Sequence, residues 1–193
     1  MVFKHILDKI FGVILLILLS PILAIIAIAI KLDSKGPVIF KQKRLGKDGE
    51  IFEIYKFRTM YVDAPDIRNE DGSTFNSDND PRVTKVGNIL RKTSLDELAQ
   101  LFNILKGEMS FIGPRPDLPE QLERYSDDEK RKLNVKPGIT GYSQAYYRNS
   151  IKAEDKFKND VFYVDNYSLI LDIKIFLATV KSVIFRSNIN NNN

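Results

Sequence analysis

The chain has 193 residues and no cysteine, which excludes a disulfide framework, a thiolate nucleophile and a zinc–thiolate site. Its single histidine, His5, lies beside a long apolar block, so we expect neither a catalytic triad nor a histidine base. The formal net charge of +4 is modest for a nucleic-acid-binding protein and suits an anionic lipid surface or a phosphorylated substrate equally well.

The first predicted element is a membrane segment. From Ile10 to Ile30 there is no ionisable side chain, and as a helix this stretch would extend about 30 Å, the thickness of a bilayer's hydrocarbon core. It lacks a small-residue cleavage site, so we interpret it as a retained anchor and not as a signal peptide. The heavier basic flank follows the block and places the main domain in the cytoplasm. The flanking residues are Lys4 and Lys9 before the block, and Lys31, Lys35, Lys41, Lys43, Arg44 and Lys47 after it.

Ser20 and Pro21 lie in the middle of this block. A proline inside a helix removes one backbone hydrogen bond, at a cost of about 3 kcal/mol in water. The pattern fits a kinked helix that spans the bilayer, and it fits equally a helix-break-helix that enters and leaves on the same face. Basic residues on both flanks mildly favour the second arrangement.

A β-hairpin is predicted next. Residues 38–40 and the alternating segment 51–55 have strand character, and Asp48-Gly49 between them suits a tight turn. Residues 63–80 are polar and without period, which indicates a loop.

Three helical segments follow. Residues 83–92 have a helical pattern, and a second helix begins near Ser94 and ends at Gly107. Its apolar stripe consists of Leu98, Leu101, Phe102 and Leu105. Residues 169–185 predict an amphipathic helix that either packs on the domain or lies in the headgroup plane. Residues 188–193 form an asparagine-rich tail that we expect to be disordered.

The chemical centre is the segment from Arg91 to Glu97, and it has two interpretations. Ser94 and Glu97 fit a capping box, with Asp96 merely favourable near the helix dipole. Alternatively, a helix start beside Arg91 attracts phosphate, and the adjacent carboxylates bind a divalent cation. The short segment alone favours the cap.

The wider pattern favours chemistry, because several motifs occur in a fixed order. They are Ser94-Leu95-Asp96-Glu97-Leu98, Gln100-Leu101-Phe102-Asn103, the segment from Gly107 to Pro116 that contains Gly113-Pro114-Arg115-Pro116, and Val135-Lys136-Pro137-Gly138-Ile139-Thr140-Gly141. In these motifs the chain resembles the bacterial sugar transferase family, the monotopic phosphoglycosyl transferases. The resemblance runs over nearly the whole chain, and we expect the small form of that family.

This resemblance implies roles for matching residues. Asp96 corresponds to the nucleophile and Glu97 to the ligand of Mg²⁺, the expected cofactor. Basic side chains implied to meet phosphate are Lys56, Arg58, Arg91 and Arg115. Arg115 is flanked by two prolines, which stiffen its backbone as suits a residue that presents a planar fork to phosphate.

Donor-binding residues are implied as well, namely Gln144, Arg148, Asn149 and Asp160. Tyr146 and Tyr147 depart from the stretch that many relatives have before Arg148, so we expect them to reshape the donor pocket. Ala99 departs from a common proline, which a helix should tolerate.

The expected fold class is therefore α+β. A membrane-embedded hairpin over residues 1–36, broken at Ser20-Pro21 and re-entrant as the resemblance favours, precedes a catalytic domain over residues 37–187. That domain is helix-rich, with a small β-hairpin and interfacial amphipathic helices. It lies on the cytoplasmic face of the bacterial inner membrane.

The expected reaction transfers a sugar-1-phosphate from a UDP-sugar to polyprenyl (undecaprenyl) phosphate through a covalent aspartyl-phosphosugar, the first membrane step of glycoconjugate assembly. The expected partners are the UDP-sugar, the polyprenyl phosphate and the lipid bilayer, without nucleic acid. Two alternatives stay open: direct transfer with Asp96 only as a metal ligand, and a non-catalytic membrane-anchored binding protein.

Overall fold

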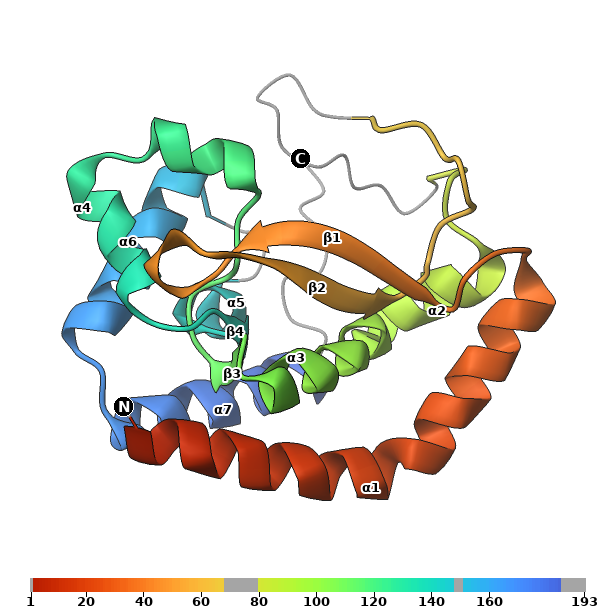
Figure 1. The fold of residues 1–193 in the computed structure, drawn as a ribbon, viewed down its shortest axis with the longest axis horizontal. Coiled ribbons are helices and arrows are strands. Elements are labelled where there is room, and N and C mark those ends of the chain that lie inside the picture. The colour runs from red at the N-terminus through yellow and green to blue at the C-terminus, as the bar shows by residue number, and fades with distance from the viewer. Residues whose placement is uncertain (1, 68–79, 148–150, 185–193) are drawn as a thin grey trace. The chain divides into compact units, whose positions relative to one another are not determined.

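A computed structural model describes residues 2–67, 80–147 and 151–184 (Figure 1). The chain forms two compact units, each built from separate stretches of sequence. Unit 1 comprises Met1–Leu18, Lys41–Tyr55 and Gln100–Asn193, and unit 2 comprises Leu19–Phe40 and Lys56–Ala99. The predicted boundary between a membrane hairpin and a catalytic domain at residue 36 stays a prediction.

The N-terminal helix α1 extends over Val2–Asp33 and contains Pro21. Helical structure continues through Ser20 and Pro21. Among the described residues, α1 is the one helix long and apolar enough to cross a membrane. Many of its apolar side chains are exposed, Ile17, Ile25 and Leu32 among them. The long apolar helix is thus confirmed, and the re-entrant arrangement stays a prediction.

The predicted β-hairpin is confirmed. Strands β1 (Ile39–Leu45) and β2 (Ile51–Phe57) pair in a two-stranded sheet. The turn contains the 3₁₀ segment η1 (Lys47–Gly49), and the Gly46 N–H donates to the Glu50 carbonyl at 2.7 Å. Asp48 and Gly49 both have positive φ, 56° and 80°, which is the backbone conformation that an Asp-Gly pair favours.

In unit 2, helix α2 (Lys85–Thr93) is fixed at its start by two side chains. Thr84 caps the helix, because its hydroxyl accepts from the Gly87 N–H at 2.9 Å. Asp33, the last residue of α1, accepts from the Val86 N–H at 3.0 Å. A Cβ on Gly87 would lie 2.0 Å from the Thr59 carbonyl oxygen, so only glycine allows this close packing of α2 on the chain after β2.

Ser94 ends α2, and the helix expected to begin there is divided. Ser94 has a left-handed backbone (φ 58°) at the C-cap of α2. The 3₁₀ segment η2 (Leu95–Gln100) follows, then helix α3 (Leu101–Lys106), which ends at Gly107 with φ 84° as predicted. An N-cap residue normally has an extended backbone, so the capping-box interpretation of Ser94 and Glu97 is wrong.

The core of unit 1 is built around two short parallel strands, β3 (Ser110–Ile112) and β4 (Gly138–Thr140), with Ser110 opposite Gly138. The helices packed around them are α5 (Tyr142–Tyr146), α6 (Ala153–Asp165) and α7 (Leu169–Ile184). Three short helical segments connect β3 to β4 along the chain, namely η3 (Pro119–Arg124), α4 (Asp127–Lys130) and η4 (Arg131–Asn134). One cluster of buried residues in this core consists of Ile112, Val135, Ala145, Tyr163 and Ile175.

The predicted helix over residues 169–185 is confirmed as α7, but its inner and outer faces are both apolar. Ile175 is fully buried in the core, and Leu171 packs against that core. Ile170, Ile173 and Leu177 are exposed at 67%, 59% and 61%, which leaves α7 with an apolar outer face. Together with the two small sheets, the helices give a mixed, helix-rich fold that confirms the α+β class.

Candidate active site

Unit 2 brings together four of the predicted site residues. Lys56 lies near the end of β2, Arg91 in α2, and Asp96 and Glu97 in η2. Ser94, with its left-handed backbone, ends α2, and the acidic pair follows in the next element, where its charges act together with that of Arg91. The Lys56 ammonium contacts Glu97 Oε1 at 2.7 Å, and both side chains are 21% exposed. The outcome is an acidic pair between two basic side chains.

Asp96 is partly buried, and burial raises the pKa of its carboxyl group. The charges of Lys56 and Arg91 act in the opposite direction, while neighbouring Glu97 adds to the increase. Arg91 is oriented by Thr59, whose hydroxyl accepts from Arg91 Nε at 3.0 Å. Burial and the two cations thus act on Asp96 in opposite directions, and burial prevails, so its pKa is raised.

The acidic pair fits a magnesium ion. Among residues 2–67, 80–147 and 151–184 there is no cluster of three or more acidic or histidine side chains that could hold a metal. Mg²⁺ in phosphoryl-transfer sites commonly takes one or two carboxylates and fills its other positions with water and substrate phosphates. Asp96 and Glu97 are two such carboxylates, and Glu97 Oε1 accepts from the Lys56 ammonium at 2.7 Å.

Arg58, predicted to bind phosphate, is placed differently. It is 5% exposed, and its guanidinium donates to the Ser34 and Pro37 carbonyl oxygens at 2.8 and 2.6 Å. The structure gives no support for a phosphate contact, because these donors serve the segment that follows α1.

Arg115 lies in unit 1, on the loop after β3. It lines a pocket formed by Leu45, Gly46, Pro114, Pro116, Asp117, Lys132, Leu133, Val135 and Pro137. Its charge acts on Asp117 and Asp160, whose carboxylates both contact the buried Lys132, at 2.7 and 2.6 Å. Asp160, predicted to contact the donor, is thus 4% exposed and paired inside the unit.

The other predicted donor-binding residues differ in what the structure says of them. Gln144 lies in α5, and its amide nitrogen and oxygen are buried with no hydrogen-bond partner among the described residues. Buried amides are normally satisfied, so this one is suited to a ligand. Arg148 and Asn149 lie outside the described residues.

Two buried polar residues received no role from the sequence. Lys132 joins Asp117 to Asp160, and Asn103 bridges α3 to β2 by accepting from the Tyr55 N–H at 2.9 Å and donating to the Glu53 carbonyl at 2.7 Å. Asn103 is part of a motif that carried the family resemblance, and that motif was the available signal. Lys132 follows the exposed Lys130 and Arg131 and has no distinguishing pattern.

The two basic side chains beside the acidic pair suit an anionic substrate, and the long apolar helix is consistent with membrane association. The chain matches the bacterial sugar transferase family over residues 1–186, and it belongs to that family.

Three curated relatives illustrate the similarity. The chain is 43% identical to "Galactosyl transferase CpsE" of Streptococcus agalactiae, over 94% of this chain and 43% of that protein. It is 42% identical to "Uncharacterized sugar transferase EpsL" of Bacillus subtilis, over 100% of this chain and 93% of that protein. It is 45% identical to the "UDP-glucose:undecaprenyl-phosphate glucose-1-phosphate transferase" of Klebsiella pneumoniae, over 93% of this chain and 40% of that protein. The chain therefore spans less than half the length of two of these relatives and nearly all of the third.

Proposed function

We propose that this protein is a phosphoglycosyl transferase that moves a sugar-1-phosphate from a UDP-sugar to undecaprenyl phosphate through a covalent intermediate on Asp96. Membership of the family supports the reaction class. The name of the Klebsiella pneumoniae relative specifies donor, acceptor and transferred group for that protein. The single observation that carries the residue assignment is the grouping of Asp96 and Glu97 with Lys56 and Arg91 in one compact unit.

In the first step, a carboxylate oxygen of Asp96 attacks the phosphorus that bears the sugar. The bond from that phosphorus to the oxygen of the α-phosphate breaks, uridine monophosphate leaves, and an aspartyl phosphosugar remains on the protein. Lys56 and Arg91 stabilise negative charge on the transferring phosphoryl group. In the second step, a phosphate oxygen of the lipid attacks the same phosphorus, and Asp96 is released as a carboxylate.

Glu97 would hold Mg²⁺ with the donor's phosphate oxygens. When bound, the ion supplies positive charge that lowers the repulsion between the anionic nucleophile and the pyrophosphate. The buried, unpartnered amide of Gln144 supports a donor contact at that residue.

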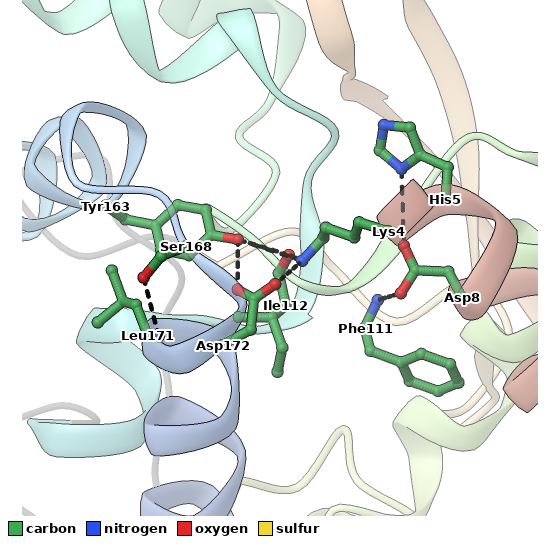
Figure 2. Close-up of polar contacts among 9 residues, drawn as sticks. All are labelled: Lys4, His5, Asp8, Phe111, Ile112, Tyr163, Ser168, Leu171 and Asp172. Atoms are coloured by element: carbon green, nitrogen blue, oxygen red, sulfur yellow. Dashed lines mark hydrogen bonds and ion pairs between the residues drawn. The ribbon is translucent and has the colours of Figure 1, made fainter. Parts of the chain in front are cut away.

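A re-entrant α1 is also part of the proposal, because both ends of this helix are tied to later parts of the chain. Figure 2 shows Lys4 at the start of α1 with its ammonium against Asp172 of α7 and Tyr163 of α6, at 2.6 and 3.2 Å. At the other end, Asp33 accepts from the Val86 N–H of α2. Each contact fixes one end of α1 to the unit that contains it. In the proposal, both ends of α1 lie on the cytoplasmic face. The exposed apolar face of α7 would then lie among the headgroups.

The test is a single-turnover experiment with purified protein, radiolabelled UDP-sugar and Mg²⁺, without lipid acceptor. The covalent route predicts label on the protein and one equivalent of uridine monophosphate, and the Asp96→Asn variant should give neither. Transfer to lipid without any labelled protein would favour direct displacement, with Asp96 only holding metal. Donor binding without turnover would favour a binding protein.

A further inference from the structure

The guanidinium of Arg58 is committed to the chain itself. Nε donates to the Pro37 carbonyl at 2.6 Å, and Nη1 donates to the Ser34 hydroxyl at 2.5 Å. Nη2 donates to the Ser34 carbonyl at 2.8 Å, and Nη1 reaches the Met60 carbonyl at 3.4 Å. All three nitrogens are used in a site that is 5% exposed. Arg58 therefore stabilises the segments of the chain that carry these oxygens.

These oxygens belong mainly to the exit of α1. Ser34 follows the last residue of that helix, and the backbone N–H of Arg58 donates to the Val38 carbonyl at 2.8 Å. Gly36 has φ 126°, a conformation that favours glycine, and a Cβ there would lie 2.4 Å from Val62 Cγ2. Lys31 of α1 donates to the Gly36 carbonyl at 2.9 Å. The chain that leaves the apolar helix is thus fixed in one conformation.

The residues next to Arg58 hold the candidate active site. Lys56, two residues earlier, pairs with Glu97, and Thr59, the next residue, accepts from Arg91. Asp33 adds a second link, because it accepts from the first turn of α2, the helix that contains Arg91. The exit of α1 and the acidic pair therefore share one support inside unit 2.

We propose that Arg58 is a positioning residue that sets the distance of Asp96 from the bilayer surface and so controls transfer to the lipid acceptor. This inference rests on the proposed function. The acceptor's phosphate is confined to the headgroup layer, so the phosphosugar on Asp96 must lie at a matching height. A misplacement of about 1 Å can slow a reaction ~10²-fold.

Two variants test this role. Arg58→Lys keeps the positive charge but replaces a planar fork with one flexible ammonium, which cannot make the same set of bonds. Ser34→Ala removes one hydroxyl and leaves Arg58 in place. Lys85→Met is the matched control, since Lys85 is an exposed cation of the same unit, outside the site.

Each variant is assayed for release of uridine monophosphate without acceptor, and then with two acceptors. One acceptor is undecaprenyl phosphate in phospholipid vesicles, and the other is a short, water-soluble prenyl phosphate that approaches the site from solution. For Arg58→Lys we expect near-normal nucleotide release, near-normal transfer to the soluble acceptor, and a fall of about ten- to a hundredfold in transfer to the vesicle acceptor. Ser34→Ala should show the same selectivity with a smaller loss.

Equal losses on both acceptors, or a loss of nucleotide release, would overturn the proposal, because Arg58 would then serve the chemistry or the fold in general. Thermal unfolding identifies a folding defect in Arg58→Lys, in which case Ser34→Ala decides by the same comparison. A wild-type protein that transfers sugar phosphate without a labelled intermediate would contradict the covalent route only. The comparison of the two acceptors would still decide the role of Arg58.

Discussion

Asp96, the proposed nucleophile, should act against stability. Burial raises the pKa of this carboxyl group, so folding disfavours its ionised form at neutral pH. Asparagine has the same shape and no charge, so Asp96→Asn should raise the thermal unfolding midpoint, by about 2–4 °C per kcal/mol gained. The gain should shrink as the pH falls, because Asp96 itself then becomes neutral. Thermal unfolding in detergent measures this, with Asp155→Asn, a more exposed carboxylate, as the control. A lowered midpoint at neutral pH would contradict it.

The raised pKa of Asp96 also predicts how the first step of the proposed reaction, the release of uridine monophosphate, depends on pH. The proposed attack on phosphorus requires ionised Asp96, so release of uridine monophosphate should decline on the acid side at a pH above the usual range of aspartate. Lys56 opposes the increase in the pKa of Asp96, so Lys56→Met should move this decline to still higher pH, besides slowing the step. Single-turnover rates across pH, with Lys85→Met for comparison, report the position of the decline. If the rate declines at the same pH in Lys56→Met as in the unmodified protein, Lys56 does not lower the pKa of Asp96.

Loss of the buried Lys132 should cost stability. Its side chain is 4% exposed and contacts Asp117 at 2.7 Å and Asp160 at 2.6 Å. Lys132→Met would remove the cation that contacts the buried Asp160 and the partly buried Asp117, and removal of one partner of a buried ion pair costs about 3–5 kcal/mol. Urea denaturation should show this loss, and the added change Asp160→Asn should recover part of it. Lys130→Met, at an exposed site, is the control, and equal stability of the two lysine variants would refute the assignment.

At the scale of elements, the packing of α2 depends on Gly87. Alanine usually stabilises a helix relative to glycine, by up to about 1 kcal/mol. Here the added Cβ would meet the Thr59 carbonyl oxygen at 2.0 Å, so Gly87→Ala must displace α2 and the Arg91 that it carries. We expect lower thermal stability and slower nucleotide release. Gly12→Ala in α1 is the control, because its nearest neighbour is a movable methyl group of Leu105 at 3.0 Å. A neutral Gly87→Ala would show that α2 is free to shift.

The elements also show what a sequence can predict. Asp48-Gly49 and Gly107 lie where local backbone conformation decides the structure, and both predictions are confirmed. Ser94 fitted a cap by spacing alone, but the Glu97 carboxylate pairs instead with Lys56, 41 residues earlier. Arg58 likewise finds partners 21 and 24 residues upstream, in Pro37 and Ser34. A period or a motif carries no information on such distant contacts, which is why the acidic pair was predicted and its support was missed.

For the whole molecule, the decisive question is on which face of the membrane each end of α1 lies. The re-entrant arrangement predicts that single cysteines at Val2 and at Lys85 are both protected from an impermeant thiol reagent in intact cells. Both cysteines should react once the membrane is permeabilised and the reagent reaches its cytoplasmic face. The chain has no cysteine of its own, so the unmodified protein is a clean background. Labelling of the Val2 variant from outside would establish a spanning helix.

The contact of Asp33 with α2 has a consequence for biogenesis. The first turn of α2 is completed by a side chain from the last residue of the apolar helix, so the nascent catalytic segment lacks one of its stabilising bonds until α1 has settled. In a newly made chain that awaits insertion, Asp96, the proposed nucleophile, would then follow a helix whose first turn lacks this bond. Under the proposed function, the support of the acidic pair would be complete only in a protein whose apolar helix is in place.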